Sequence, residues 1–481
     1  MNELADTSRG APLSGPLTTS VAVGNDSLTA AGIHSQRGVD DASALLSRLF
    51  RSYDGCVVVR LWDGTLLTLG RGASNPPREA PAFTLVFRHP EVVGLLVLGR
   101  DRLRLADAYF RGDMDIEGDF FAALSLKDHL DTIHLSLSDR MCTLWAAIRL
   151  RMLARKLANI GSERPSLEAG FVKAHSRVEN KDAIHFHYDV SNDFYALWLD
   201  DLMVYSCAYF DRPDETLEQA QRAKLDHICR KLMLKPDDRF LDVGCGWGAL
   251  IIHAAQHYGV HAHGVTLSQQ QLELCRTRIA DAGLAGRVTV ELLDYRDLEG
   301  ACVYDKVASV GMFEHVGLDN LPVYFSTIHR LLKPSGLFLN HGITHDVEGW
   351  EKTSSTEFIN RYVFPDGQLD TVSNIQCAME AARFEIADVE ALRPHYALTL
   401  RHWVSRLESH HAQALRYVNE STYRVWRLYM AACALEFESG EIGVYQVLGC
   451  KRDVGAAALP LSRRHLYSAI TSRKDAILNE T

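Results

Sequence analysis

The stretch from Phe240 to Gly248 combines residue types that suit the binding of a small ligand. It reads Phe-Leu-Asp-Val-Gly-Cys-Gly-Trp-Gly, an apolar run that ends in Asp242 and is followed by three glycines at alternate positions. Glycine lets the backbone turn sharply and lets a ligand approach it closely. The pattern predicts a buried strand, a tight turn and a helix that begins near Ala249.

The spacing of these glycines separates the loop from two other glycine-rich loops. It is G-x-G-x-G rather than the G-x-G-x-x-G of NAD and FAD folds, and the Lys-Ser/Thr pair of a phosphate-binding P-loop is missing. The stretch resembles motif I of methyltransferases that use S-adenosylmethionine (SAM), where the loop surrounds the amino-acid end of SAM. The competing interpretation is a plain glycine turn in an α/β sheet, which the acid ahead of three glycines disfavours.

Polar and aromatic residues follow the next two predicted strands. Thr266, Leu267 and Gln271 come after the second strand, where many nucleotide-binding folds place an acid for the ribose hydroxyls. Asp294 and Tyr295 come after the third strand and suit an adenine site. Asp294 also suits the N-cap of a helix, and one residue can serve both purposes.

Five motifs occur in a fixed order: His187-Tyr-Asp-Val-Ser-Asn-Asp193, Tyr205-Ser-Cys-Ala-Tyr-Phe210, the glycine loop, Phe313-Glu-His315 and Pro394-His-Tyr396. Together they resemble the cyclopropane-fatty-acid-phospholipid synthase family, which includes the mycolic-acid cyclopropane synthases. The resemblance runs from about Asp182 to Lys451. The N-terminal part resembles the extra domain of the bacterial members that act on phospholipids.

The resemblance implies a SAM-dependent reaction at a cis double bond of an acyl chain. The alkene attacks the methyl group of SAM, a carbocation forms, and loss of a proton from the transferred methyl closes a cyclopropane ring. Family members bind bicarbonate as the base, and no metal is implied. The residues implied as ligands of the bicarbonate, and so as catalytic, are Cys207, Glu314, His341, Ile343 through its backbone, and Tyr396. Cys433 is implied as a further catalytic residue. Cys433 lies among apolar residues, which favours an inert buried thiol over a catalytic one.

The resemblance also implies which residues bind SAM: Tyr205, Ser206, Asp242, Gly244, Cys245, Gly246, Trp247, Gly248, Thr266, Leu267, Gln271, Tyr295 and Arg296. Arg296 replaces an acid found in some relatives, and Cys245 fits the turn because it is small. Four aromatic residues suit either stabilisation of the cation or core packing: Tyr209, Phe210, Phe313 and Tyr396.

Other functions compete with ring formation. An acyl-chain methyltransferase that gives a methyl- or methylene-branched product begins with the same cation, so the motifs do not separate the two. A small-molecule methyltransferase is disfavoured by the Tyr205–Phe210 and Glu314-His315 motifs. A lipid-binding protein without activity is disfavoured by the intact glycine loop.

Alternating strands and helices must position these residues. Strands are predicted over 239–243, 260–267, 288–293, 306–310 and 337–343. This rhythm is typical of a parallel sheet covered by helices on both faces. The predicted fold is therefore α/β, a Rossmann-like doubly wound sheet of the SAM-methyltransferase type, preceded by a small α+β domain.

The predicted domains are a flexible tail over 1–40, the α+β domain over 41–137, a basic helix and linker over 138–170, the methyltransferase domain over 171–451 and a C-terminal tail over 452–481. The α+β domain contains a hairpin with a turn at Asp63-Gly64, a strand at 83–87 and a helix from Pro90. Residues 401–438 are predicted to be helical and amphipathic.

The composition excludes several classes of protein. A net charge of −10 argues against nucleic acid as a partner, and the ten cysteines lack C-x-x-C pairs. Signal-peptide and membrane-spanning patterns are missing from the sequence, which favours a cytoplasmic protein that associates peripherally with the inner face of the membrane. A homodimer is compatible with the sequence, which does not indicate the oligomeric state.

The predicted helix 140–158 contrasts with the acidic whole. It carries Arg140, Arg149, Arg151, Arg155 and Lys156 and contains no acid. A basic amphipathic helix of this kind suits an anionic lipid surface. The alternative is a linker helix whose basic face is merely solvated. Trp145, Ile148, Met152 and Leu153 are expected to share one face of this helix.

Overall fold

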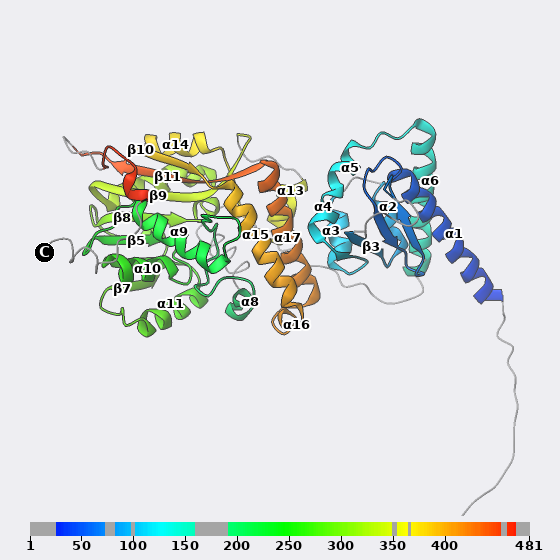
Figure 1. Cartoon of the computed structure of the whole chain (residues 1–481), viewed down its shortest axis with the longest axis horizontal. Coiled ribbons are helices and arrows are strands. Elements are labelled where there is room, and N and C mark those ends of the chain that lie inside the picture. The colour runs from blue at the N-terminus through cyan, green and yellow to red at the C-terminus, as the bar shows by residue number, and fades with distance from the viewer. Residues whose placement is uncertain are drawn as a thin grey trace, which may run out of the picture.

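The computed structural model describes residues 26–72, 82–97, 102–158, 191–348, 354–363, 367–453 and 459–467. Two bodies lie side by side in it, a smaller N-terminal domain and a larger C-terminal domain (Figure 1). Helices α15 (Arg393–Ser409) and α17 (Glu420–Ser439) form the side of the larger domain that faces the smaller one.

The N-terminal domain is built on a four-stranded sheet of order β2-β1-β3-β4. The predicted hairpin is confirmed: β1 and β2 pair antiparallel, and Gly64 has a φ of 90° that favours glycine in the turn. Its strands are β1 (Val57–Arg60), β2 (Leu66–Leu69), β3 (Phe83–Phe87) and β4 (Met114–Gly118). Its helices are α1 (Asp26–Leu49), α2 (Pro90–Leu95), α3 (Arg102–Phe110), α4 (Phe120–Leu124), α5 (Leu126–Thr132) and α6 (Leu137–Ala158).

The structure corrects three predicted boundaries. Helix α1 begins at Asp26, so the flexible tail expected over 1–40 is wrong for residues 26–40, and residues 1–25 lie outside the described ranges. Helix α6 packs against α1 and α2, so it belongs to the N-terminal domain rather than to a linker. The expected C-terminal tail contains α18 (Arg464–Tyr467), whose Leu466 is buried beside α9 (Leu217–Lys231). In each case apolar residues of the supposed tail or linker gain burial.

The C-terminal domain contains a seven-stranded sheet of order β10-β11-β9-β8-β5-β6-β7. Five of its strands confirm the predicted ones within a few residues. Phe240 packs on one face of the sheet, while its neighbour Leu241 packs on the other, as expected of a strand buried on both sides. The strands are β5 (Arg239–Val243), β6 (His261–Thr266), β7 (Val288–Leu292), β8 (Tyr304–Val310), β9 (Leu332–His345), β10 (Phe384–Ala391) and β11 (Ile442–Lys451).

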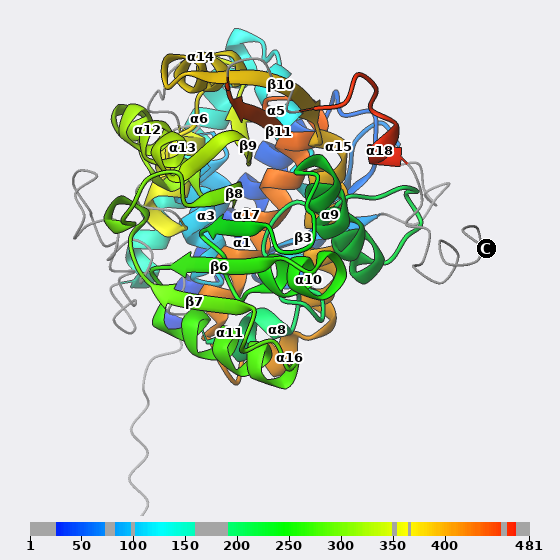
Figure 2. The same ribbon diagram turned by 90° about the vertical axis from the view of Figure 1, so that its left-hand side faces the viewer.

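Helices cover both faces of this sheet, as Figure 2 shows. One face packs against α9, α10 (Ala249–Tyr258) and α11 (Gln269–Asp281), and the other packs against α12 (Leu321–Leu331) and α14 (Val372–Ala381). The remaining elements of the domain are α8 (Asn192–Ala196), η1 (Tyr295–Asp297), η2 (Phe313–His315), η3 (Leu318–Asn320), α13 (Ser354–Tyr362) and α16 (His411–Ala414).

Strand order places the binding site. The chain runs from β5 outward to β6 and β7, and then returns to the other side of β5 with β8 and β9. Ligands of doubly wound sheets bind at the carboxyl ends of the strands where the order reverses, which here means the ends of β5 and β8. The glycine loop follows β5, and the Phe313-Glu-His315 motif follows β8.

Two features of the C-terminal domain were not predicted. Strands β10 and β11 complete one edge of the sheet, and β11 runs antiparallel to both of its neighbours. The predicted helical region 401–438 is divided, because Asn419 caps the start of α17 by accepting a hydrogen bond from the backbone of Thr422 at 2.8 Å.

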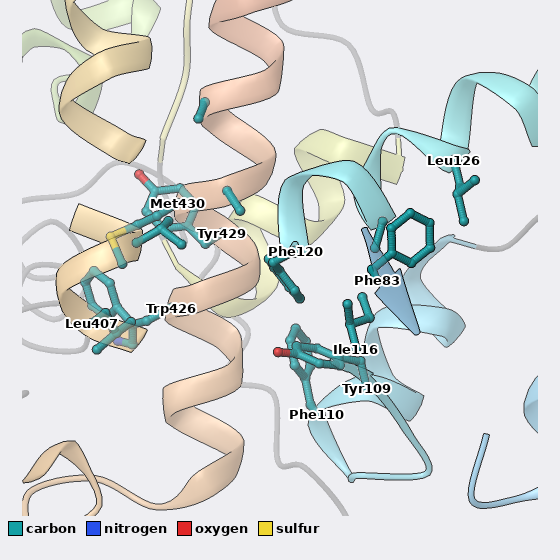
Figure 3. Packing of buried hydrophobic residues seen from close by; sticks show 14 of the residues in the cluster. Phe83, Tyr109, Phe110, Ile116, Phe120, Leu126, Leu407, Trp426, Tyr429 and Met430 are labelled. Atoms are coloured by element: carbon teal, nitrogen blue, oxygen red, sulfur yellow. The ribbon is translucent and has the colours of Figure 1, made fainter. Parts of the chain in front are cut away.

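The two domains are joined by a buried arginine of α17. Arg424 donates to the carboxylate of Asp115 on β4 and to the backbone carbonyl of Tyr109 on α3, both at 2.9 Å. The apolar side chains of both domains form one continuous cluster around it, part of which Figure 3 shows. The N-terminal domain is therefore packed against α17.

Candidate active site

The glycine loop turns as its sequence predicts. Gly244, Gly246 and Gly248 have φ values of 81°, 53° and 85°, which favour glycine. A β-carbon at Gly248 would lie 2.3 Å from the sulfur of Cys275, so this glycine also permits close packing of α10 on α11. Gly248 forms the N-cap of α10.

A cleft opens above this loop, and we call it the glycine-loop cleft. Every residue that the sequence analysis proposed for SAM binding lines it, except Gly248. The walls come from the loop itself, from the ends of β6, β7 and β8, and from the segment 203–206. Residues far apart in the sequence thus meet at one edge of the sheet.

Two buried ionisable groups, Asp242 and Lys224, line this cleft and influence each other electrostatically. Burial raises the pKa of Asp242 to about 7, although Lys224 opposes the shift, and Asp242 Oδ1 has no hydrogen-bond partner among the described residues. Burial lowers the pKa of Lys224 to about 8, and its Nζ donates to Ser206 Oγ at 2.9 Å. Lys224 was not proposed from the sequence, yet it lines the cleft.

Other contacts fix the walls of the cleft. The Thr266 hydroxyl donates to Gln271 Oε1 at 2.7 Å. Asp294 accepts from the backbone N–H of Arg296 at 2.9 Å and forms an ion pair with its guanidinium at 2.5 Å. Asp294 therefore acts as the N-cap of η1, and the Arg296 guanidinium lies 5.6 Å from the centre of the Tyr295 ring.

The motif 187–193 lies partly outside the described residues, which resume at Ser191. Ser191 caps α8 by accepting a hydrogen bond from the backbone of Phe194. The side chain of Asn192 accepts a hydrogen bond from Trp247 Nε1 at 2.8 Å. This contact joins the end of the motif to the glycine loop.

A second cavity of about 360 Å³, which we call the Glu314 cavity, adjoins the cleft. All six residues proposed as catalytic line it: Glu314, His341, Tyr396, Cys207, Ile343 and Cys433. The cleft and the cavity share Tyr205, Ser206, Gly311 and His315 in their walls. A ligand in the cleft and a ligand in the cavity would meet at these four residues.

Glu314 and His341 present polar atoms that the described protein leaves unpaired. Glu314 Oε1 accepts from the backbone N–H of Ile343 at 2.8 Å, while Oε2 has no partner. Gln446 Nε2 lies 3.1 Å from His341 Nδ1. Because an amide nitrogen only donates, Nδ1 accepts and the ring proton resides on Nε2, which also has no partner. Gln446 was not proposed from the sequence.

Burial also sets the charges of these two groups. It raises the pKa of Glu314 to about 7, against the hydrogen bond from Ile343. It lowers the pKa of His341 well below the usual range, so the imidazole is neutral. Burial lowers the pKa of the neighbouring His315 to about 4. Near pH 7 the cavity wall therefore offers a neutral imidazole N–H and a carboxyl group that readily holds a proton.

The geometry changes the expectation for Ile343. Its backbone was proposed to bind bicarbonate, but its N–H is already donated to Glu314. The adjacent glycine explains the close fit, since a β-carbon at Gly342 would lie 3.0 Å from Glu314 Oε1. Ile343 thus orients Glu314.

Neither cavity thiol is suited to act as a nucleophile. Burial raises the pKa of Cys207, and its sulfur lies 3.8 Å from the carbonyl oxygen of Leu392. Burial also raises the pKa of Cys433 well above the usual range. Because the thiolate is the reactive form, both residues are expected to contribute packing rather than covalent chemistry.

Of the four aromatic residues considered for cation stabilisation, Tyr396 lines the cavity. The other three fit the alternative of core packing, because their rings pack elsewhere. Tyr209 stacks between His227 and His395, and Phe210 stacks on His402. Phe313 is buried in the core on the α12 side of the sheet.

Comparisons with known proteins agree with this geometry. The family model described as mycolic acid cyclopropane synthetase matches residues 175–447. A probable fatty acid methyltransferase of Pseudomonas putida is 40% identical over 412 residues, which cover 85% of this chain and 95% of that protein. The cyclopropane-fatty-acyl-phospholipid synthase of Escherichia coli K12 is 41% identical over 264 residues, 54% of this chain and 66% of that protein. The solved structure of the mycolic acid cyclopropane synthase CmaA1 with SAH and CTAB is 35% identical, covers 58% of this chain and 99% of that one, and has a TM-score of 0.53.

Proposed function

The chain belongs to the mycolic acid cyclopropane synthetase family of SAM-dependent methyltransferases, and from this we propose that it converts a cis double bond of a phospholipid acyl chain into a cyclopropane ring. One observation carries the proposal. A cleft of the SAM type opens into an apolar cavity whose wall holds Glu314 and His341. The mostly apolar wall suits a hydrocarbon acceptor better than a polar one.

The chain's own residues hold the double bond in position and keep water away from it. The double bond must lie near Tyr205 and His315, where cleft and cavity meet, to attack the methyl group bound to sulfur. The new carbon–carbon bond leaves a cation, which the apolar wall shields from water. Loss of a proton from the transferred methyl then closes the ring, and the electrons of the broken C–H bond form its last carbon–carbon bond.

The residues present fit the bicarbonate that the family resemblance implies as the base. Two atoms in the cavity wall, Glu314 Oε2 and His341 Nε2, lack partners among the described residues. A neutral imidazole donates through Nε2, and a protonated Glu314 donates through Oε2, so neither group repels an anion. When bound there, bicarbonate would accept the proton that ring closure releases.

Mass spectrometry of lipids tests the proposal. Expression in a host that makes unsaturated phospholipids should give acyl chains heavier by one methylene group and resistant to reagents that attack double bonds. Products that keep a double bond, or that are heavier by a further molecule of hydrogen, would instead identify a methylene- or methyl-branching enzyme. The similarity to the P. putida protein, named a probable fatty acid methyltransferase, makes this the second candidate.

The base is tested separately with Glu314→Gln and His341→Ala. Each variant should lose about 10² to 10⁴ in turnover while its affinity for SAM is unchanged, because both groups lie outside the glycine-loop cleft. In buffer free of dissolved carbonate the wild type should lose activity and regain it on addition of bicarbonate. Normal turnover by both variants would refute the assigned base site.

We also propose that α6 holds the enzyme on an anionic bilayer. No helix among the described residues is long and apolar enough to cross one. The outer face of α6 instead carries a stripe of exposed apolar side chains, which we call the α6 stripe: Leu137, Met141, Leu144, Trp145 and Met152. Exposed Arg140, Arg151 and Arg155 lie beside or within it at helical spacing. A stripe of this kind combines apolar insertion with attraction to anionic lipid.

A further inference from the structure

A third cavity lies between the two domains. It has a volume of about 280 Å³, and we call it the interdomain cavity. Leu85, Ile116 and Leu124 contribute to its wall from the N-terminal domain, while Leu428 and Ala432 contribute from α17. In Figure 3, Phe120 and Ile116 of the smaller domain lie on one side of α17, and Trp426 and Met430 lie on the other side.

The interdomain cavity adjoins the Glu314 cavity. Ile359 of α13 and Cys433 and Glu436 of α17 line both of them. On α17, Leu428, Ala432 and Leu435 line the interdomain cavity, whereas Tyr429 and Phe437 line the Glu314 cavity. The glycine-loop cleft, the Glu314 cavity and the interdomain cavity therefore lie in a row, each sharing wall residues with the next.

The lining of the interdomain cavity selects hydrocarbon. Nearly all of its described lining residues are aliphatic or aromatic, and the charged ones among them are Lys127 and Glu436. A phosphate-bearing head group would lose its hydration there, with Lys127 as the one cationic donor among these residues. An alkyl chain has no such hydration to lose.

A double bond within an acyl chain has carbon on both sides. When it is placed at the junction of cleft and cavity, one arm leads back to the ester and the head group, and the other arm ends in a methyl group. We propose that the methyl-terminal arm passes Cys433 and enters the interdomain cavity, so that the N-terminal domain forms part of the acyl-binding site. This inference rests on the proposed function, since it presumes an acyl substrate.

The inference predicts selectivity for the length of that arm. For a substrate supplied as a monomer in water, each methylene that this arm buries in the cavity should improve kcat/KM by about fourfold until the cavity is filled. Length added between the ester and the double bond should have a smaller effect. The enzyme should thus select its substrates by the distance from the double bond to the methyl end.

Two variants narrow the cavity from opposite walls. Ala432→Phe acts from α17 and Leu124→Phe acts from α4, and neither residue contacts the glycine-loop cleft or the Glu314 cavity. Phospholipids with a fixed distance from ester to double bond, and with a short or a long methyl-terminal arm, are supplied as competing monomers below their critical micelle concentration. Both variants should lower the long-to-short ratio of kcat/KM by about tenfold or more, while turnover of the short-arm lipid and SAM affinity persist. Ala280→Phe, at an exposed position of α11, is the matched control.

Three outcomes decide the matter. A lowered ratio in either folded variant, with an unchanged ratio in the control, supports the inference. An unchanged ratio in both, or a change that follows the ester-side arm instead, overturns it. A wild-type enzyme that modifies no lipid at all, the short-arm lipid included, would instead overturn the proposed function. Turnover of the short-arm lipid by the wild type thus tests the proposed function separately from the inference.

Discussion

Burial determines the protonation states of Glu314 and His341 in the Glu314 cavity. A carboxylate beside a bound anion would repel it, and the sequence leaves open how that repulsion is relieved. The structure provides the means, because Glu314 is desolvated and accepts one backbone hydrogen bond, which leaves its pKa at about 7. His341 is deprotonated for the same reason of burial. Both groups can therefore act as neutral donors.

The raised pKa of Glu314 predicts a pH-dependent effect of Glu314→Gln on stability. The folded carboxyl titrates at about 7 rather than 4.5, so the native state keeps a proton that the unfolded chain releases in between. This group's contribution to wild-type stability is full below pH 4.5 and is lost as pH rises to about 7. Glutamine does not titrate. The Tm of the variant should rise relative to wild type across this window, by the equivalent of about 3 kcal/mol at most.

The measurement is a series of thermal melts from pH 4.5 to 8, with Glu299→Gln on the exposed surface as the matched control for the substitution itself. A difference between Glu314→Gln and wild type that stays constant with pH would contradict the raised pKa.

Cys433 gives a second prediction at the same scale. Its thiol is not ionised, so Cys433→Ser should keep kcat/KM on unsaturated vesicles within about fivefold of wild type, under about 1 kcal/mol of transition-state free energy. Cys433→Trp should lose about tenfold to a hundredfold, because the indole would fill the passage where two cavities meet. SAM affinity, measured by calorimetry, should be unchanged in both. A Cys433→Ser enzyme that is folded and binds SAM but is inactive would show that the Cys433 thiol is catalytic.

At the residue scale, motifs with local spacing were predictable and contacts across the fold were not. The glycine loop and the residues after each strand reach the predicted cleft, since strand ends of a parallel sheet converge. Lys224 had a signal that was overlooked, a charge on the buried stripe of α9 that includes Leu217, Gln221 and Ile228. Gln446 had none, because it meets His341 only through the pairing of β11 with β9.

Among the elements, α6 carries a surface that its own sequence describes only in part. The helix packs through Ala146, Ala147 and Leu150, and its opposite face bears the α6 stripe. Leu153 was expected on the exposed face but turns toward α1, where it closely approaches Gly38. Arg149 is bound by Asp41 through two hydrogen bonds of 2.7 and 2.5 Å. Its charge is therefore engaged within the protein.

Replacement of Arg140, Arg151 and Arg155 together by glutamine should weaken sedimentation with anionic vesicles. Each basic residue near such a surface contributes about 1 kcal/mol, so the affinity should fall by up to about a hundredfold at low salt. The loss should be smaller on zwitterionic vesicles, and SAM affinity should not change. Arg149→Gln is the matched control, with the smaller effect expected of a charge already paired. Unchanged sedimentation of the triple variant would leave the α6 stripe without a role at the membrane.

The elements that the sequence failed to predict share one property, which is that tertiary packing decides them. Strand β10 alternates acids with apolar residues and is stable because β11 pairs with it. Helix α1 begins in a stretch rich in Ser, Thr and Ala and acquires its buried face by packing against α6, α2 and the small sheet. Local propensity is a weak guide where burial comes from distant segments.

At the scale of the whole molecule, the two domains were predicted but their contact was not. The sequence indicates a small α+β domain ahead of a methyltransferase domain, with a linker between them. The structure joins them through α17, whose Arg424 is nearly buried and reaches Asp115 on β4. Burial opposes ionisation of Asp115, yet its pKa is lowered because Arg424 and the backbone N–H of Ile116 favour the carboxylate.

Replacing Arg424 should therefore loosen the two domains. In Arg424→Leu, Asp115 keeps Arg88, which lies within its own domain, but loses its partner across the interface. Breaking a buried ion pair from one side costs about 3 kcal/mol or more. Chemical denaturation followed by two probes should then separate into two transitions. Turnover of phospholipid should fall while SAM affinity persists, because none of the described residues that line the glycine-loop cleft belongs to the N-terminal domain. Arg88→Leu removes the exposed partner of the same carboxylate and should leave unfolding cooperative between the domains. Coincident transitions and full turnover in Arg424→Leu would mean that the apolar contacts along α17 hold the domains together without the arginine.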